Sequence, residues 1–291
     1  MSYNLSGAFI LINLIAITTL TCKQNIESFK KLKEELREAE NIKNNPEIYT
    51  KNAHTDEIRQ KKIIVAKLRD KIIRSKYTLQ AYSKNDDWIE DHVLYGVDNQ
   101  QVFKIAKDYY NGEVYASRNN RSSRKLIYLA LEYRRFAIIN FEIILNKLAE
   151  KANANITYKQ NEYDVNTEYN ILIEDILTSF KKYAHNYFEI ALIPLSQKQN
   201  NLYYLSLKDL QQLKDKFDEL QKIRDAGKIY LMTIYNDFQN NKDNIKDGDA
   251  TYLKNYINNM KYKYKFQKLA NKAEELAYQI SQILNVKKVQ I

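Results

Sequence analysis

The residue with the most definite chemistry is Cys22, the only cysteine in the 291-residue chain. It follows an uncharged leader: no charged side chain precedes Lys23, and Ala8–Leu20 reads AFILINLIAITTL. A short apolar segment that ends in one cysteine is typical of a lipoprotein signal, in which the thiol is acylated and the preceding residues are removed. We therefore predict a signal peptide over residues 1–21 and lipidation of Cys22.

Two other interpretations of the leader stay open. A membrane-spanning helix needs about 20 apolar residues to cross ~30 Å of hydrocarbon, and the apolar run here is shorter and contains Asn13 and Thr18. A buried helix of the globular domain is the other alternative. Two details fit a signal poorly, because the residues before Ala8 include no Lys or Arg, and Thr19-Leu20-Thr21 is bulkier than usual. The length of the apolar segment still favours the signal.

The remaining reactive side chains form no recognisable catalytic or metal-binding pattern. His54, His92 and His185 are far apart, and none has a second histidine or a cysteine at the spacing of metal ligands. No HExxH, P-loop, GxGxxG or GxSxG motif occurs. We therefore predict no catalytic residue, metal ligand or cofactor and expect the chain not to be an enzyme.

Two further segments suggest binding chemistry but fit another interpretation better. Asp243–Asp249 resembles a calcium loop, but Ile245 and Lys254 then occupy ligand positions, so a turn leading to a helix N-cap is the better prediction. The aromatic run Tyr262–Phe266 could stack on nucleotides. On a helix its side chains point in several directions, which favours a core contribution and a Lys-rich surface.

Composition favours long helices. The chain has 5 Gly and 2 Pro, whereas tight turns and positive φ angles depend on such residues. A single cysteine excludes an intramolecular disulfide, so stability must come mainly from packing. We predict an all-α fold, a single compact bundle over residues 54–291, behind a lipidated and partly disordered tether over residues 22–53.

Apolar residues with helical spacing predict about seven helices that pack antiparallel around one core. Thr55, Asp98, Thr167 and Ser206 are expected at helix starts. The apolar face of the expected helix 167–194 carries Ile171, Ile173, Leu177 and Phe180, and that of the helix 98–111 carries Tyr109. Arg118–Ser122 is expected to be a loop. Pro194 is expected to bend or stop its helix, and Gly227 to be tolerated. The expected helices span about 55–82, 86–96, 98–111, 122–148, 167–194, 207–238 and 250–284.

The formal charge is +10, from 46 basic and 36 acidic residues. These charges are interspersed and form no basic block, and an exported protein has little nucleic acid to meet. We therefore expect no nucleic-acid partner. The charge can still steer the chain towards acidic partners such as glycosaminoglycans or acidic patches of serum proteins.

Several segments, in this order, resemble a Borrelia outer-surface lipoprotein family that includes complement regulator-acquiring surface protein A and the virulent-strain-associated lipoproteins. The resemblance covers roughly Asp86 to Leu284. The segments that carry it are Ser123–Tyr133 (SRKLIYLALEY), Ile143–Leu148 (IILNKL), Leu205–Phe217 (LSLKDLQQLKDKF), Asn244–Lys246 (NIK) and Lys272–Ala277 (KAEELA).

This resemblance implies a helical bundle on a tether in the outer membrane of a spirochaete. Some family members bind factor H, late complement components or plasminogen, and ligand choice differs between close relatives. In complement regulator-acquiring surface protein A the long last helix contributes to dimerisation and regulator binding. The matching element is about Ala250–Leu284, so a second copy of the chain is a candidate partner. The resemblance assigns no individual binding residue to this sequence.

We therefore expect a surface lipoprotein of the outer membrane, anchored by lipid and facing the cell exterior. Its expected partners are host serum proteins, with complement factor H or late complement components first, in immune evasion. Two alternatives stay open: an adhesin for host matrix or acidic glycans, and a surface antigen without a specific ligand.

Overall fold

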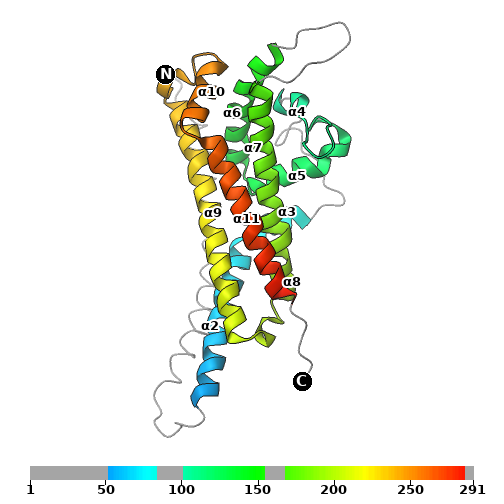
Figure 1. Ribbon diagram of the computed structural model, residues 1–291, viewed down its shortest axis with the longest axis vertical. Coiled ribbons are helices and arrows are strands. Elements are labelled where there is room, and N and C mark those ends of the chain that lie inside the picture. Colours follow the sequence, from blue (N-terminus) through cyan, green and yellow to red (C-terminus); the bar gives the residue numbers. More distant parts are fainter. Residues whose placement is uncertain (1–51, 84–100, 155–167, 286–291) are drawn as a thin grey trace, which may run out of the picture. The chain divides into compact units, whose positions relative to one another are not determined.

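The computed structural model describes residues 52–83, 101–154 and 168–285 (Figure 1). The predicted signal, Cys22, most of the tether and the predicted helix 86–96 lie outside these residues. The chain divides into two units, Met1–Lys67 and Leu68–Ile291. The described part of the first unit is helical, and the second unit contains the bundle.

The all-α prediction is confirmed, because every regular element in the described ranges is helical, apart from an isolated antiparallel bridge between Lys107 and Val114. Within the same ranges no helix is long and apolar enough to cross a membrane. The α-helices are α2 (Asn52–Arg74), α3 (Lys76–Ser83), α4 (Gln101–Ile105), α5 (Arg121–Ala130), α6 (Arg135–Ala154), α7 (Glu168–Ala184), α8 (Ile193–Lys198), α9 (Leu207–Gln239), α10 (Ala250–Asn259) and α11 (Tyr262–Leu284). The other helical elements are the 3-10 turns η2 (Arg118–Asn120), η4 (Leu202–Tyr204) and η5 (Lys242–Asn244) and the π-helix η3 (His185–Leu192).

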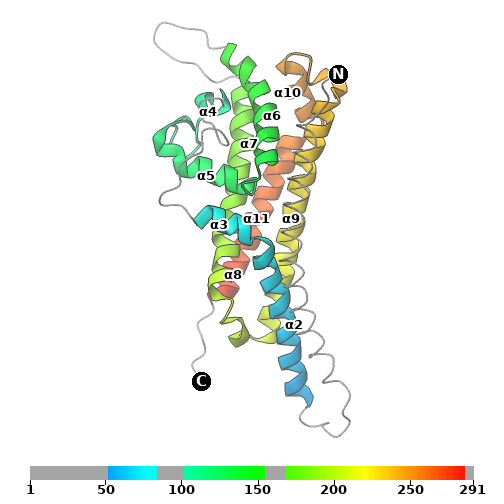
Figure 2. The same cartoon turned by 180° about the vertical axis from the view of Figure 1, so that it is seen from behind.

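The second unit packs around α7 and α11. Helix α11 lies against α7, α9 and η3, while α6 contacts α4, α7, α9 and α10, and α5 packs on α7 (Figures 1 and 2). Apolar side chains at three- and four-residue spacing face this contact, and Ile173, Leu213 and Ala273 are fully buried. The positions between these apolar residues hold charged side chains, which face the solvent.

Three of the predicted helices are interrupted where the sequence has neither Gly nor Pro. The predicted helix 122–148 breaks at Glu132 and Tyr133, and the predicted helix 250–284 breaks at Lys261, all three with positive φ. The predicted helix 55–82 breaks at Ser75, which is fully buried. The break at Lys261 separates two sets of neighbours, because α10 packs on α6, whereas α11 packs on α7 and α9.

Several boundary predictions also need correction. Helix α2 begins at Asn52, so Thr55 lies inside it and is not the N-cap. Helix α5 begins at Arg121, directly after η2, where a loop was expected. Ile171 is exposed and does not face inwards, although its neighbours Asn170 and Leu172 are buried.

Pro194 does not stop its helix. It occupies the first turn of α8, where a missing backbone N–H is tolerated. The π-helix η3 leads into this turn, and the N–H of Ile193 donates to the carbonyl of Phe188, five residues back. The wider turn continues the helical path as far as Lys198.

The predicted helix 98–111 is replaced by a short helix and a turn. Helix α4 ends at Ile105, and Tyr109, expected on the inner face, is 80% exposed. The physical reason is Asp108, whose buried carboxylate accepts a hydrogen bond from Nζ of Lys181 at 2.5 Å. A buried charge requires such a partner, and this pair ties the turn to α7.

Helix α9 agrees closely with the helix predicted from the sequence. The hydroxyl of Ser206 accepts a hydrogen bond from the N–H of Asp209 at 3.0 Å, as predicted for an N-cap. Gly227 lies inside the helix without ending it. The segment before α10 is also confirmed as a turn that leads to a helix N-cap, because Asp249 accepts from the N–H of Thr251 at 2.8 Å.

Candidate binding surface

The corner between α5 and α6 places a carboxylate inside the protein. Glu132 and Tyr133 have φ angles of 57° and 54°, a left-handed conformation that costs about 1–2 kcal/mol per non-glycine residue. Their N–H groups donate to the carbonyls of Leu129 and Tyr128, each at 2.9 Å. These bonds close the corner, and the side chain of Glu132 then points towards α9.

Glu132 is the centre of an ion cluster. Its Oε1 accepts from Nε of Arg224 at 2.6 Å and from Nζ of Lys228 at 2.7 Å, and its Oε2 lies 3.4 Å from a guanidinium nitrogen of Arg134. Arg224 also donates to the hydroxyl of Ser75 at 3.3 Å. The cluster therefore connects the α5–α6 corner, α9 and the break between α2 and α3.

Burial by itself raises the pKa of the Glu132 carboxyl, but hydrogen bonds and charges from Arg224 and Lys228 outweigh it and hold that pKa at about 2. Glu132 is therefore ionised at neutral pH. The pKa of Lys228 is lowered, first by burial and then by the positive charges of Arg224 and Arg134, against the opposing effect of Glu132. The cluster holds three cations against one carboxylate.

A pocket of about 260 Å³ lies beside this cluster, between the first half of α6 and the second half of α9. A second cavity of about 50 Å³ shares Ala130, Glu132, Lys228 and Leu231 with it. The pocket is mostly apolar. Its residues are Ala130, Leu131, Glu132, Arg134, Phe136, Ala137, Asn140, Phe141, Ile144, Lys228, Leu231 and Met232.

Two residues that line this pocket, Phe136 and Met232, are large, apolar and exposed, and the exposed Ile139 and Ile143 on α6 and Ile229 on α9 follow in the same helices. The ring of Phe136 lies edge-on against that of Tyr235, with 5.5 Å between centroids, so the two helices share one surface. Exposed contiguous apolar area on a soluble protein typically marks an interaction site. We define the α6–α9 surface as Arg134, Phe136, Ile139 and Ile143 of the α6 side and Lys228, Ile229 and Met232 of α9.

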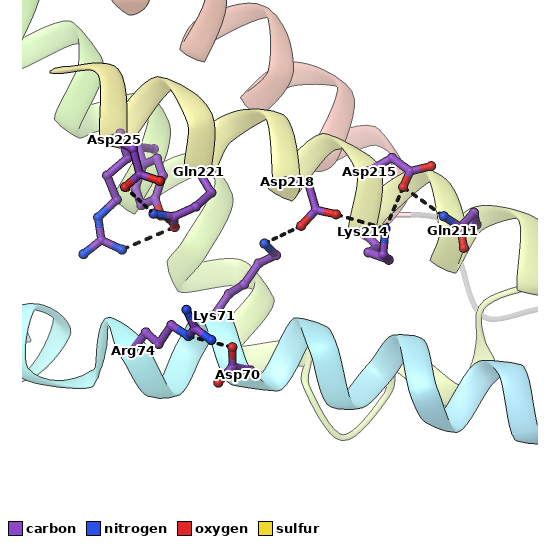
Figure 3. A network of polar contacts seen from close by, with 11 residues as sticks. Asp70, Lys71, Arg74, Gln211, Lys214, Asp215, Asp218, Gln221 and Asp225 are labelled. Atoms are coloured by element: carbon purple, nitrogen blue, oxygen red, sulfur yellow. Dashed lines mark hydrogen bonds and ion pairs between the residues drawn. The ribbon is translucent and has the colours of Figure 1, made fainter. Parts of the chain in front are cut away.

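A different face of α9 is saturated with charge pairs (Figure 3). Lys71 contacts Asp218 at 2.6 Å, and Lys214 contacts both Asp215 and Asp218 at 2.9 Å. Gln211 donates to Asp215 at 2.8 Å. These charges bind one another, so this face offers a partner little unpaired charge, whereas the α6–α9 surface carries excess cations.

The one histidine whose side chain is described, His185, forms a local polar cluster. Its Nδ1 lies 2.5 Å from Oε2 of Glu189, which also accepts from the hydroxyl of Tyr82. Lys125 lies over the ring of Tyr82 at 4.4 Å. The hydrogen bond that His185 donates to Glu189 raises the pKa of His185, and burial opposes this shift.

The other residues considered from the sequence do not gather at one site. The side chains of His54 and His92 lie outside the described part of the chain, as does Cys22, so its lipidation stays a prediction. Among the described side chains no group of three or more His, Cys, Asp and Glu could hold a metal ion. In the Asp243–Asp249 loop the amide of Asn241 accepts from two backbone N–H groups.

Sequence reasoning missed the Glu132 cluster. Its members are far apart in the chain, 92 residues separating Glu132 from Arg224. One signal was available: Glu132 interrupts an apolar run that reads LIYLALEY. A charged residue at an inward-facing position of such a run indicates either a break in the helix or a buried partner, and here both occur.

The aromatic run Tyr262–Phe266 is placed as predicted. Tyr262 and Phe266 are buried and Tyr264 is exposed. Lys265 lies over the rings of Tyr230 and Tyr262, at 5.3 and 4.6 Å. The buried rings are core residues and are not available to stack on nucleotides.

The fold is similar to that of solved Borrelia proteins. The protein BSE31 of Borrelia (Borreliella) spielmanii matches with a TM-score of 0.56 and 22% identity over 77% of this chain and 98% of that one. BSA64 of Borrelia spielmanii matches with a TM-score of 0.59 and 18% identity over 77% and 97%. The outer surface protein BBA65 of Borrelia burgdorferi matches with a TM-score of 0.58 and 17% identity over 75% and 99%.

None of the curated proteins compared with the chain matches it. The family model described as "Borrelia Bbcrasp-1 domain containing protein" matches residues 84–285, which is more than half of the chain. This match confirms the resemblance inferred from the sequence: the chain belongs to the family of Borrelia Bbcrasp-1 domain containing proteins.

Proposed function

We propose that the chain is a lipid-anchored protein of the Borrelia outer surface that binds host serum proteins, complement components or regulators first among them. Family membership supports this proposal, as does the likeness to a solved protein described as an outer surface protein. The α6–α9 surface is the observation that carries it.

That surface has the properties of a protein interface. Its apolar side chains are between 37% and 62% exposed, and burying them against a partner is favourable by about 25 cal/mol per Å². Arg134 and Lys228 lie at its edge, with more positive charge than Glu132 neutralises. Apolar anchors beside arginine are typical of interface hot spots, and the cations favour an acidic partner surface.

A serum capture experiment tests the binding proposal. The mature chain, residues 22–291 without the acyl group, is the bait, and mass spectrometry identifies what it retains. We expect a complement component or regulator that the double variant Phe136→Ser/Met232→Ser loses. Tyr278→Ser is the control, because Tyr278 is also a large exposed apolar residue but lies on α11. If the unaltered bait retains no serum protein, the proposal is wrong.

The control variant also separates the two candidate faces. Loss of capture in Tyr278→Ser alone would assign binding to the last helix and overturn the role of the α6–α9 surface. Capture of heparin, weakening as salt screens the charges, without capture of any complement protein would favour the adhesin alternative.

The anchor needs a separate experiment. Metabolic labelling with palmitate is expected to label the parent protein and not Cys22→Ala. Label retained in the variant would overturn the assignment of Cys22 as the lipidation site.

A further inference from the structure

The pocket in the α6–α9 surface is large enough for a ligand of its own. An engineered apolar cavity of about 150 Å³ binds benzene, and typical small-molecule pockets begin at about 300 Å³. The volume here is about 260 Å³. Such a volume suits part or all of a short hydrocarbon chain.

The walls of the pocket are mostly hydrocarbon. They come from both helices and from the corner, and two wall residues, Phe136 and Met232, are themselves partly exposed, so the pocket reaches the protein surface. The apolar wall residues are Leu131, Phe136, Phe141, Ile144, Leu231 and Met232.

The polar groups of the pocket favour an anion. Lys228 and Arg134 line it, and both contact Glu132, whose single negative charge is already shared with Arg224. Asn140 also lines it and is buried, and its Nδ2 has no hydrogen-bond partner in the described part of the chain. A buried donor without a partner costs about 1–3 kcal/mol, so this amide is a further group that an acceptor could satisfy.

We propose that this pocket binds a single-chain carboxylate amphiphile, a fatty acid of medium length, with its hydrocarbon between α6 and α9 and its carboxylate beside Lys228 and Arg134. A neutral amphiphile would leave the excess positive charge of the pocket uncompensated, and a cationic amphiphile would add to that charge. A small inorganic anion leaves the apolar walls unfilled. This proposal does not rest on the binding of serum proteins.

The chain offers a site-specific probe for this ligand. It contains 3 methionines, Met1, Met232 and Met260. Met232 lines the pocket, whereas Met260 is exposed at the end of α10 and reports non-specific contact with an amphiphile. In residues 22–291 labelled with ¹³C at the methionine methyl groups, Met232→Leu assigns the two signals.

Titration with sodium octanoate, octanol and octyltrimethylammonium tests the proposal. We expect octanoate to shift the Met232 methyl signal saturably and to leave that of Met260 unchanged. Octanoate should bind at least about tenfold more tightly than octanol, and the cation more weakly than both. No shift of Met232, equal shifts of the two methionines, or equal affinity for octanoate and the cation would each overturn the proposal.

Two variants test the role of the cations. Lys228→Gln and Arg134→Gln should each weaken octanoate about tenfold while the affinity for octanol stays the same. The side chain of Arg134 is 64% exposed, so Arg134→Gln is expected to fold even if Lys228→Gln does not. The test then rests on Arg134→Gln. Unchanged octanoate affinity in both variants would show that the pocket recognises hydrocarbon alone, which overturns the assignment of an anionic ligand.

Discussion

Glu132 and Arg224 form a buried ion pair, with Oε1 and Nε 2.6 Å apart, that joins the α5–α6 corner to the middle of α9. Both side chains are less than a tenth exposed. The pair thus holds in place a corner made of two left-handed residues, and Glu132 also lines the pocket. Stability and binding are expected to depend on the same carboxylate.

Glu132→Gln is expected to destabilise the protein by about 3–5 kcal/mol, the usual cost of leaving a buried charge without its partner. The amide keeps the shape of the side chain but leaves Arg224 and Lys228 uncompensated. Urea unfolding followed by circular dichroism measures the change.

The matched control for this variant is Glu275→Gln. Glu275 pairs with Lys272 at 2.9 Å on the exposed side of α11, where water and salt screen the charges. Its replacement should leave the unfolding midpoint unchanged. Equal losses in the two variants would contradict a special role for the buried pair.

The same carboxylate predicts an acid limb in the stability curve. The pKa of Glu132 falls from an ordinary 4.5 to about 2 on folding. Because folding lowers this pKa, the ionised carboxylate of Glu132 contributes fully to the free energy of unfolding above about pH 4.5. This contribution is lost as the pH falls through 2. The shift corresponds to about 3–4 kcal/mol, at about 1.4 kcal/mol per pKa unit. The difference in unfolding free energy between parent and Glu132→Gln should shrink over this range.

His185 predicts the opposite pH dependence. Its hydrogen bond to Glu189 raises its pKa above 6.5, although burial opposes the shift. Because folding raises this pKa, protonated His185 contributes fully to the free energy of unfolding below pH 6.5. This contribution is lost as the pH rises through the pKa of the folded state. The parent should therefore melt at a higher temperature than His185→Gln in acid, and the gap should close with rising pH. A gap that widens would contradict this assignment.

Local sequence patterns were sufficient where local physics decides the structure. The cap at Ser206 and the periodicity of Ile173, Leu177 and Phe180 depend on neighbours within a few residues, and both predictions are confirmed. Ile171 was assigned to the same face but is exposed. Periodicity locates a buried stripe, while tertiary packing decides how wide it is.

The helix breaks and the pocket could not be predicted in this way. Glu132 and Tyr133 adopt left-handed angles without glycine, and the residues of α9 that bind Glu132, Arg224 and Lys228, come more than 90 residues later in the chain. The unpaired amide of Asn140 becomes informative only once Lys228 is known to line the same pocket. Family resemblance identified the fold but assigned no residue to this site.

Lys261 allows the strain at a break to be measured directly. It separates α10 from α11 with a φ of 57° and is exposed, so its replacement removes little packing. Glycine adopts this angle without the cost of about 1–2 kcal/mol, but it loses more entropy on folding, by roughly 0.5–1 kcal/mol. Lys261→Gly should therefore raise the free energy of unfolding by about 0.5–1 kcal/mol.

The control is Lys268→Gly, an exposed lysine inside α11, which should lower the free energy of unfolding by about 1 kcal/mol because glycine is unfavourable in a helix interior. Urea unfolding measures both variants. If Lys261→Gly raises the free energy of unfolding and Lys268→Gly lowers it, the backbone at Lys261 is strained in the parent, at the break that lets α10 pack on α6. Destabilisation by both substitutions would instead mean that the side chain of Lys261 stabilises the break, and the strain argument would be wrong.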